Sequence, residues 1–109
     1  MKAIPCKINK EAPGYIQTEV EEATHVMLNL PGLTGKLTLP IILKGIRQGT
    51  NCWSWNGSVD KPTLKPSILT SFGTIGTCHS FVNEGKVQFL SDSTHSLAGQ
   101  TVDLLDVTL

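Results

Sequence analysis

The fold is decided by the stretch Thr77-Cys78-His79-Ser80-Phe81-Val82-Asn83-Glu84-Gly85-Lys86-Val87-Gln88-Phe89-Leu90. Two runs of alternating character, 77–82 and 86–90, flank the turn residues 83–85, and this pattern predicts a β-hairpin. Successive side chains of a strand point to opposite faces. In the first arm one face therefore carries Cys78, Ser80 and Val82, and the other carries Thr77, His79 and Phe81.

The second arm places Val87 and Phe89 on one face and Lys86, Gln88 and Leu90 on the other. One face of each arm is thus the more apolar one, as expected for strands that cover a core. We expect this hairpin to form the centre of the domain, with the segment around Trp53 and Trp55 packed nearby.

Short strands separated by turn residues continue outward from the hairpin. The predicted strands are 25–30 and 36–42, joined across 31–35, then 52–55, 67–72 and a weak last strand within 100–109. Segment 61–66 carries two prolines, which predicts an extended edge or loop segment rather than a central strand. Residues 15–23 fit either two turns of helix or a strand that leads into a turn, and we favour the strand.

Helix signals are scarce, because ten glycines and six prolines interrupt most of the 109 residues. The expected fold class is therefore all-β or β-rich, as a small antiparallel sheet or sandwich. We expect one domain over 1–109, with an N-terminal segment at 1–24 and a β core at 25–106.

The charge balance limits the function classes. Nine Lys and Arg offset nine Asp and Glu, and nucleic-acid binding through phosphate contacts normally needs a basic excess. Charged residues make up only 17%, which favours a protein partner or a homo-oligomer.

No apolar run is long enough to span a membrane, the start does not resemble a signal peptide, and three widely spaced cysteines make a poor disulfide framework. These features indicate a reducing cytoplasm.

Two arrangements of reactive side chains are conceivable. Cys78-His79 and His95 are potential zinc ligands, but neighbouring strand residues point to opposite faces, which favours a buried thiol beside a hydrogen-bonded histidine. The second arrangement is a nucleophile with its base, drawn from Cys78 or Ser80, His79 or His95, and Asp92 as the orienting group. Residue types alone do not establish such a triad.

Two further segments suggest binding. Trp53 and Trp55 lie two residues apart and so share a strand face, either as part of the core or as a stacking platform. The loop 91–101 is rich in small polar residues around His95, which suits a capped turn or a polar ligand. The acidic residues near position 20 form a solvated face.

The second half of the chain resembles a family of small uncharacterised phage and prophage proteins whose members are often mislabelled as ammonia monooxygenase. The resemblance covers about residues 25–106 and rests on three motifs: Trp53-x-Trp55-Asn56-Gly57, Cys78-His79-Ser80-Phe81-Val82, and Thr94-His95-x-Leu97-Ala98-Gly99-Gln100-Thr101-Val102.

The resemblance implies a zinc-ribbon-like β module, in which a Cys-x-x-Cys pair meets the Cys-His of the hairpin. In this chain Leu30, Leu33 and Ser93 stand where the family carries cysteine, whereas Cys78 and His79 are kept. Leucine cannot bind zinc but adds apolar contact. We therefore expect no bound metal and no other cofactor.

These observations predict a non-enzymatic phage-type accessory protein in the host cytoplasm. Its partner would be a host protein, such as a component of a defence system, or a small nucleotide. The alternatives are a small hydrolase that depends on Cys78 or His95, with or without metal, and a virion or assembly component. The expected contact surface consists of Trp53, Trp55, Asn56, His79, Thr94, His95 and Gln100.

Overall fold

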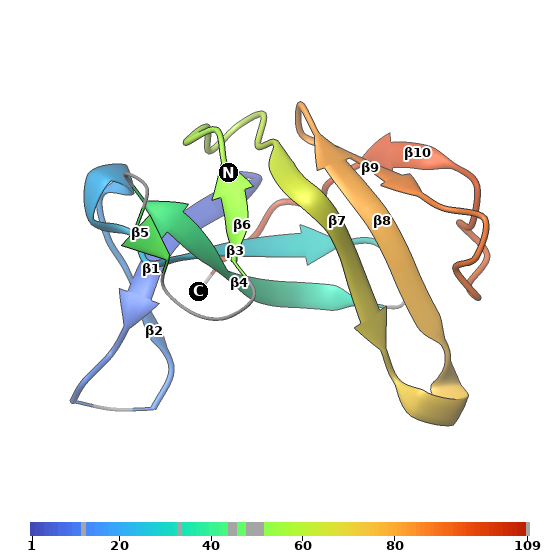
Figure 1. Ribbon diagram of the computed structural model, residues 1–109, viewed down its shortest axis with the longest axis horizontal. Helices are drawn as coiled ribbons and strands as arrows, with labels where there is room; N and C mark the ends of the chain where they lie inside the picture. Colours follow the sequence, from blue (N-terminus) through green and yellow to red (C-terminus); the bar gives the residue numbers. More distant parts are fainter. Residues whose placement is uncertain (12, 33, 44–45, 48–51, 109) are drawn as a thin grey trace.

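One curled β-sheet contains every strand of the computed structural model, which describes residues 1–11, 13–32, 34–43, 46–47 and 52–108 (Figure 1). In chain order the strands are β1 (Ala3–Ile8), β2 (Tyr15–Gln17), β3 (His25–Leu30), β4 (Gly35–Leu43), β5 (Ile46–Arg47), β6 (Trp53–Trp55), β7 (Leu64–Ser71), β8 (Thr77–Asn83), β9 (Lys86–Phe89) and β10 (Thr101–Asp103). Two short 3₁₀ turns are η1 (Val20–Glu22) and η2 (Gly73–Ile75).

The neighbours in the sheet follow the order β10-β9-β8-β7-β6-β4-β3-β1-β2, and β5 pairs with β4. Every described pairing is antiparallel except that of β4 with β6, which is parallel. The predicted β-rich class is confirmed. No helix in the described part of the chain is long and apolar enough to span a bilayer.

The predicted hairpin is β8–β9, with Ser80 opposite Phe89 and Val82 opposite Val87. Its two turn residues, Glu84 and Gly85, have φ of 52° and 77°, which fits the type I′ turn that matches strand twist. A Cβ on Gly85 would lie 3.1 Å from the Asp60 carbonyl oxygen, so this position also needs glycine for space. The hairpin lies toward one end of the sheet, however, and β6 lies at the middle of the strand order.

Most other predicted strands are confirmed, including the β3–β4 hairpin and the short strand β10 near the C-terminus. Leu33 and Leu109, which belong to the predicted segments, lie outside the described residues. Residues 15–23 form the short strand β2 followed by η1, in agreement with the favoured alternative. Strand β1 was not predicted, although it pairs with both β2 and β3.

The prediction for segment 61–66 was wrong in part. Leu64, Lys65 and Pro66 belong to β7, which lies between β6 and β8 rather than at an edge. The register of β7 against β8 shifts between Leu64 and Ile68, so the ladder is interrupted where Pro66 lacks an N–H group. The bulge lets an internal strand accept a proline.

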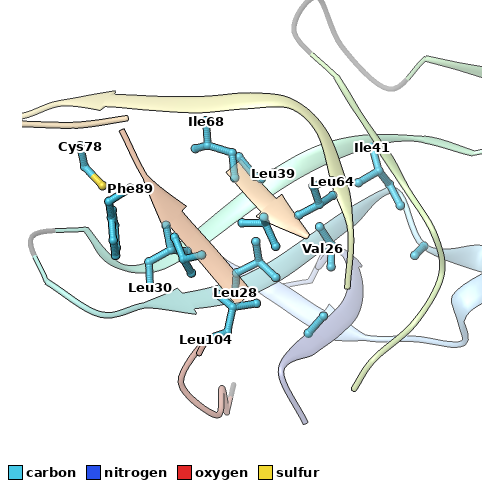
Figure 2. Packing of buried hydrophobic residues seen from close by; sticks show 14 residues of the cluster. Val26, Leu28, Leu30, Leu39, Ile41, Leu64, Ile68, Cys78, Phe89 and Leu104 are labelled. Carbon is cyan, nitrogen blue, oxygen red and sulfur yellow. The ribbon is translucent and has the colours of Figure 1, made fainter. Parts of the chain in front are cut away.

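The core fills the space between the two arms of the curled sheet. Figure 2 shows side chains of β3 and β4 facing those of β7, β8 and β9. The largest members with almost no exposed surface include Leu28, Leu30, Ile41, Leu64, Ile68, Val82, Phe89 and Leu104. Alternate residues of each strand point inward, so this packing also determines which side chains remain outside.

A second, smaller cluster lies around β1 and contains Ile4, Cys6, Met27 and Val107. Burial raises the pKa of the Cys6 thiol to about 11, because the charged thiolate is disfavoured away from water. Cys6 therefore acts as a small apolar side chain. The N-terminal strand is thus part of the packed structure.

Replacement of Leu28 by alanine should strongly destabilise the fold. Leu28 is fully buried between the two arms, and such truncations cost about 2–5 kcal/mol through lost burial and the cavity left behind. Urea unfolding followed by tryptophan fluorescence measures the change. Leu69, which is 61% exposed, is the matched control, and Leu69→Ala should change stability by less than about 0.5 kcal/mol. Equal effects of the two variants would contradict this account of the core.

Candidate functional site

The outer face of β7 and β8 carries polar and reactive side chains. Leu69 of β7 pairs with His79 of β8, and Ser67 lies two residues earlier on the strand. Cys78 and Ser80 point inward and are buried, whereas the intervening His79 points outward and stays partly exposed. The hairpin formed by β7 and β8 extends beyond the other strands, with η2 at its tip (Figure 1).

Ser67, His79 and Asp92 form a continuous hydrogen-bonded chain on this face. His79 Nε2 lies 3.0 Å from Ser67 Oγ. On its other side, His79 Nδ1 lies 3.0 Å from Asp92 Oδ2 and 3.3 Å from Oδ1. An ionised carboxylate only accepts hydrogen bonds, so it favours the tautomer with hydrogen on Nδ1. Nε2 is then free to accept the Ser67 hydroxyl proton, as a general base must.

Asp92 lies in an exposed loop, yet the loop is fixed against β8 on both sides of it. Before Asp92, the Leu90 N–H donates to the His79 carbonyl oxygen at 2.8 Å. After it, the Thr94 N–H donates to the Thr77 carbonyl oxygen at 2.9 Å, and the Thr77 N–H donates to Thr94 Oγ1 at 2.8 Å. These bonds keep the carboxylate beside the imidazole although 64% of the Asp92 side chain is exposed.

Ser93 connects this loop directly to the backbone of the histidine. Its Oγ accepts a hydrogen bond from the His79 N–H and donates one to the His79 carbonyl oxygen, each at 2.9 Å. Ser93 is buried, with 7% of its surface exposed, so water offers little replacement for these bonds. The residue next to Asp92 therefore holds the position of His79.

The nucleophile proposed from the sequence is not the one that the structure places at the histidine. Cys78 and Ser80 are 1% and 0% exposed and lie on the inner face, because strand neighbours alternate. His79 and Asp92 were among the candidates for base and orienting group, and they do lie together. Ser67 was missed, although the short link 73–76 between two alternating runs predicts a hairpin that places it on the outer face with His79.

The tryptophans and Asn56 support the structure around this site. Trp53 and Trp55 both pack against the core, and Trp53 Nε1 donates to the Ser67 carbonyl oxygen at 3.3 Å. The Trp55 indole donates to the Ser58 carbonyl oxygen at 3.2 Å. Asn56 Oδ1 accepts the N–H groups of Ser58 and Thr63, both at 3.1 Å. Trp53 therefore helps to fix the backbone of Ser67.

The remaining residues of the predicted contact surface lie in the loop after β9. His95 packs its ring edge to face against Phe89 at a centroid distance of 4.6 Å, and its Nδ1 accepts the Leu97 N–H at 3.3 Å. The Gln100 amide donates to the Ser96 carbonyl oxygen at 3.3 Å. These contacts stay within the loop and its neighbouring strand. Of the residues in the predicted contact surface, His79 is the one that belongs to the hydrogen-bonded chain with Ser67 and Asp92. The surface as a whole stays a prediction.

The zinc site that the resemblance implies for its family has no suitable set of ligands in the described part of this chain. No group of three or more His, Cys, Asp and Glu side chains there could hold an ion, and a structural zinc site needs four donors. Leu30 is 1% exposed within the same core cluster as Cys78 (Figure 2). We assign no chemical step to a metal.

Ser93→Ala should destabilise the protein by about 1–3 kcal/mol, because it leaves the partly buried N–H of His79 without its acceptor. Urea unfolding measures the difference in free energy. Ser91→Ala is the control, since Ser91 is exposed on the same loop and its change should stay within about 0.5 kcal/mol. Superimposable unfolding curves for Ser93→Ala and the unmodified protein would show that the two hydrogen bonds of Ser93 to the His79 backbone contribute nothing to stability.

In a comparison with protein-family models, residues 2–90 match the family described as the bacterial ubiquitination-like system serine protease (BubE). The matched segment includes Ser67 and His79 and ends two residues before Asp92. No curated protein and no solved structure matches the chain. The resemblance to the phage and prophage family stays a prediction. Since the match covers most of the 109 residues, the chain belongs to the family of the bacterial ubiquitination-like system serine protease, BubE.

Proposed function

We propose that this protein is a serine protease of a bacterial ubiquitination-like system, with Ser67 as nucleophile, His79 as general base and Asp92 as the orienting carboxylate. The observation that carries the proposal is the chain of two 3.0 Å contacts from Ser67 Oγ through the imidazole to Asp92. The description of the family, which names a serine protease, supports the same reading. The hydrolase alternative is thereby favoured over a non-enzymatic binding role.

The proposed reaction follows from the position of each atom. Ser67 Oγ attacks the carbonyl carbon of a peptide bond while its proton passes to His79 Nε2. The protonated imidazole then gives this proton to the leaving amine, and an acyl ester on Ser67 remains. Water, deprotonated by the same Nε2, attacks the ester and releases the acid product together with free Ser67. Asp92 stays ionised and stabilises the imidazolium in between.

The solvent exposure of Asp92 limits how strongly its carboxylate can stabilise the protonated form of His79. Exposed ion pairs contribute only about 0.2–1 kcal/mol, and 64% of the Asp92 side chain is exposed. Its electrostatic effect on the imidazolium is therefore weakened by water and salt. Its effect on the tautomer and on the orientation of the ring persists, because the loop is held by backbone hydrogen bonds.

Ser67→Ala and His79→Ala should each remove peptidase activity, with losses on the order of 10³-fold or more. An active-site-directed fluorophosphonate probe should label Ser67 in the unmodified protein and fail to label either variant. Ser71→Ala is the matched control, because Ser71 is exposed further along β7 with the same side-chain direction. Full cleavage by Ser67→Ala, or labelling at Ser71 instead, would contradict the assignment.

Asp92→Asn should lower kcat about 10²-fold to 10⁴-fold, because an asparagine amide can donate to Nδ1 and favour the tautomer that cannot accept the Ser67 proton. Exposure places the expected loss in the lower part of that range. Steady-state kinetics on a peptide substrate measures it. Asp103→Asn is the control, because Asp103 of β10 pairs with Lys86 of β9 and this variant should leave kcat unchanged. An unchanged kcat for Asp92→Asn would remove Asp92 from the mechanism.

A further inference from the structure

A groove with a volume of about 280 Å³ runs along the same outer face as Ser67. Its lining comes from β7, β8 and β9 and consists of Thr63, Leu64, Lys65, Phe81, Val82, Asn83 and Gln88. Leu64 and Val82 direct their side chains into the core, whereas Lys65, Phe81 and Gln88 are exposed on the side of the groove. The ring of Phe81 thus gives the groove an apolar surface beside the polar ends of Lys65 and Gln88, which is typical of a site for one side chain with a polar end.

The groove lies directly beside the proposed catalytic residues. Lys65 precedes Ser67 by two residues on β7, and Phe81 follows His79 by two residues on β8. Strand β7 bulges between Leu64 and Ile68, so the spacing follows from β8, where two residues of extended chain span about 7 Å. An extended substrate whose scissile carbonyl lies at Ser67 therefore reaches the groove with the side chain located about two residues from the scissile bond.

The groups at the rim define the ligand chemistry. Lys65 is the only charged residue among the lining residues, and none of the ion pairs of the described residues involves it. The side-chain oxygen Oδ1 of Asn83 accepts a hydrogen bond from Thr63 Oγ1 at 3.3 Å, and the Nδ2 amino group of Asn83 remains as a donor. The Gln88 amide has no partner in the described part of the chain. An ammonium with two amide N–H donors matches a carboxylate.

We propose that this groove is a substrate subsite that binds an acidic side chain about two residues from the scissile bond, with Lys65 as the specificity-determining residue. The proposal rests on the proposed protease function. It adds the class of substrate side chain that the enzyme prefers. No Lys, Arg, Asp or Glu occurs between Pro66 and Asn83, so Lys65 is the one charged side chain that β7 and β8 contribute to this face. The Asp92 carboxylate lies beside His79 and is not part of the groove lining.

The test uses a proteome-derived peptide library, with cleavage products sequenced by mass spectrometry. The unmodified protein should enrich Glu or Asp at one position within three residues of the cleaved bond. Lys65→Glu should abolish that enrichment and favour Lys or Arg at the same position. For a matched pair of Glu and Lys peptides, the ratio of kcat/KM should change by roughly fivefold to tenfold, as expected for reversal of one partly exposed charge contact.

Lys7→Glu is the matched control, because Lys7 is exposed on β1 at the other end of the strand order and makes the same change in net charge. It should leave the preference unchanged. Lys65→Met keeps the alkyl stem and should remove the preference without reversing it, which provides a second variant if Lys65→Glu does not fold. Cleavage that depends on Ser67 but shows no acidic preference, or a preference that both Lys65 variants retain, would overturn the subsite. Cleavage that persists in Ser67→Ala would instead overturn the proposed function.

Discussion

The strict alternation of side chains along β8 is the constraint on which the rest of the structure depends. Its inward residues Cys78, Ser80 and Val82 are almost completely buried against the opposite arm of the sheet. A shift of one residue in register would place His79 in the core and bring a buried thiol to the surface. The apolar packing of one face therefore determines which side chains lie on the other, and the stability of the core and the position of His79 cannot be separated.

The sequence predicts a large part of the fold because period-2 patterns and turn residues are local signals. The β8–β9 and β3–β4 hairpins illustrate this, since both have alternating arms and glycine in the connection. Strand β1 was missed because Ala3–Ile8 contains a proline and does not alternate clearly. The internal position of Pro66 was missed because a bulge depends on the neighbouring strands, which no local pattern records.

The candidate site was predictable only in part, for a similar reason. His79 and Asp92 stood out by residue type, and the predicted hairpin brings the loop after β9 close to β8. Ser67 did not stand out, because serine is common and its meaning depends on the pairing of β7 with β8. The role of Ser93 depends on two hydrogen bonds to backbone groups, and these are set by loop geometry rather than by sequence spacing.

The order of the groups along the chain has a consequence for how such a site arises. Ser67, His79 and Asp92 come from one meander, in which β7 carries the first, β8 the second and the loop after β9 the third. Their assembly closes only short loops, so the entropic cost of bringing them together is small. The distant N-terminal strands contribute support instead of reactive groups. The proposed catalytic groups therefore depend on one short stretch of the sequence, and a change in chain length outside residues 67–92 need not separate them.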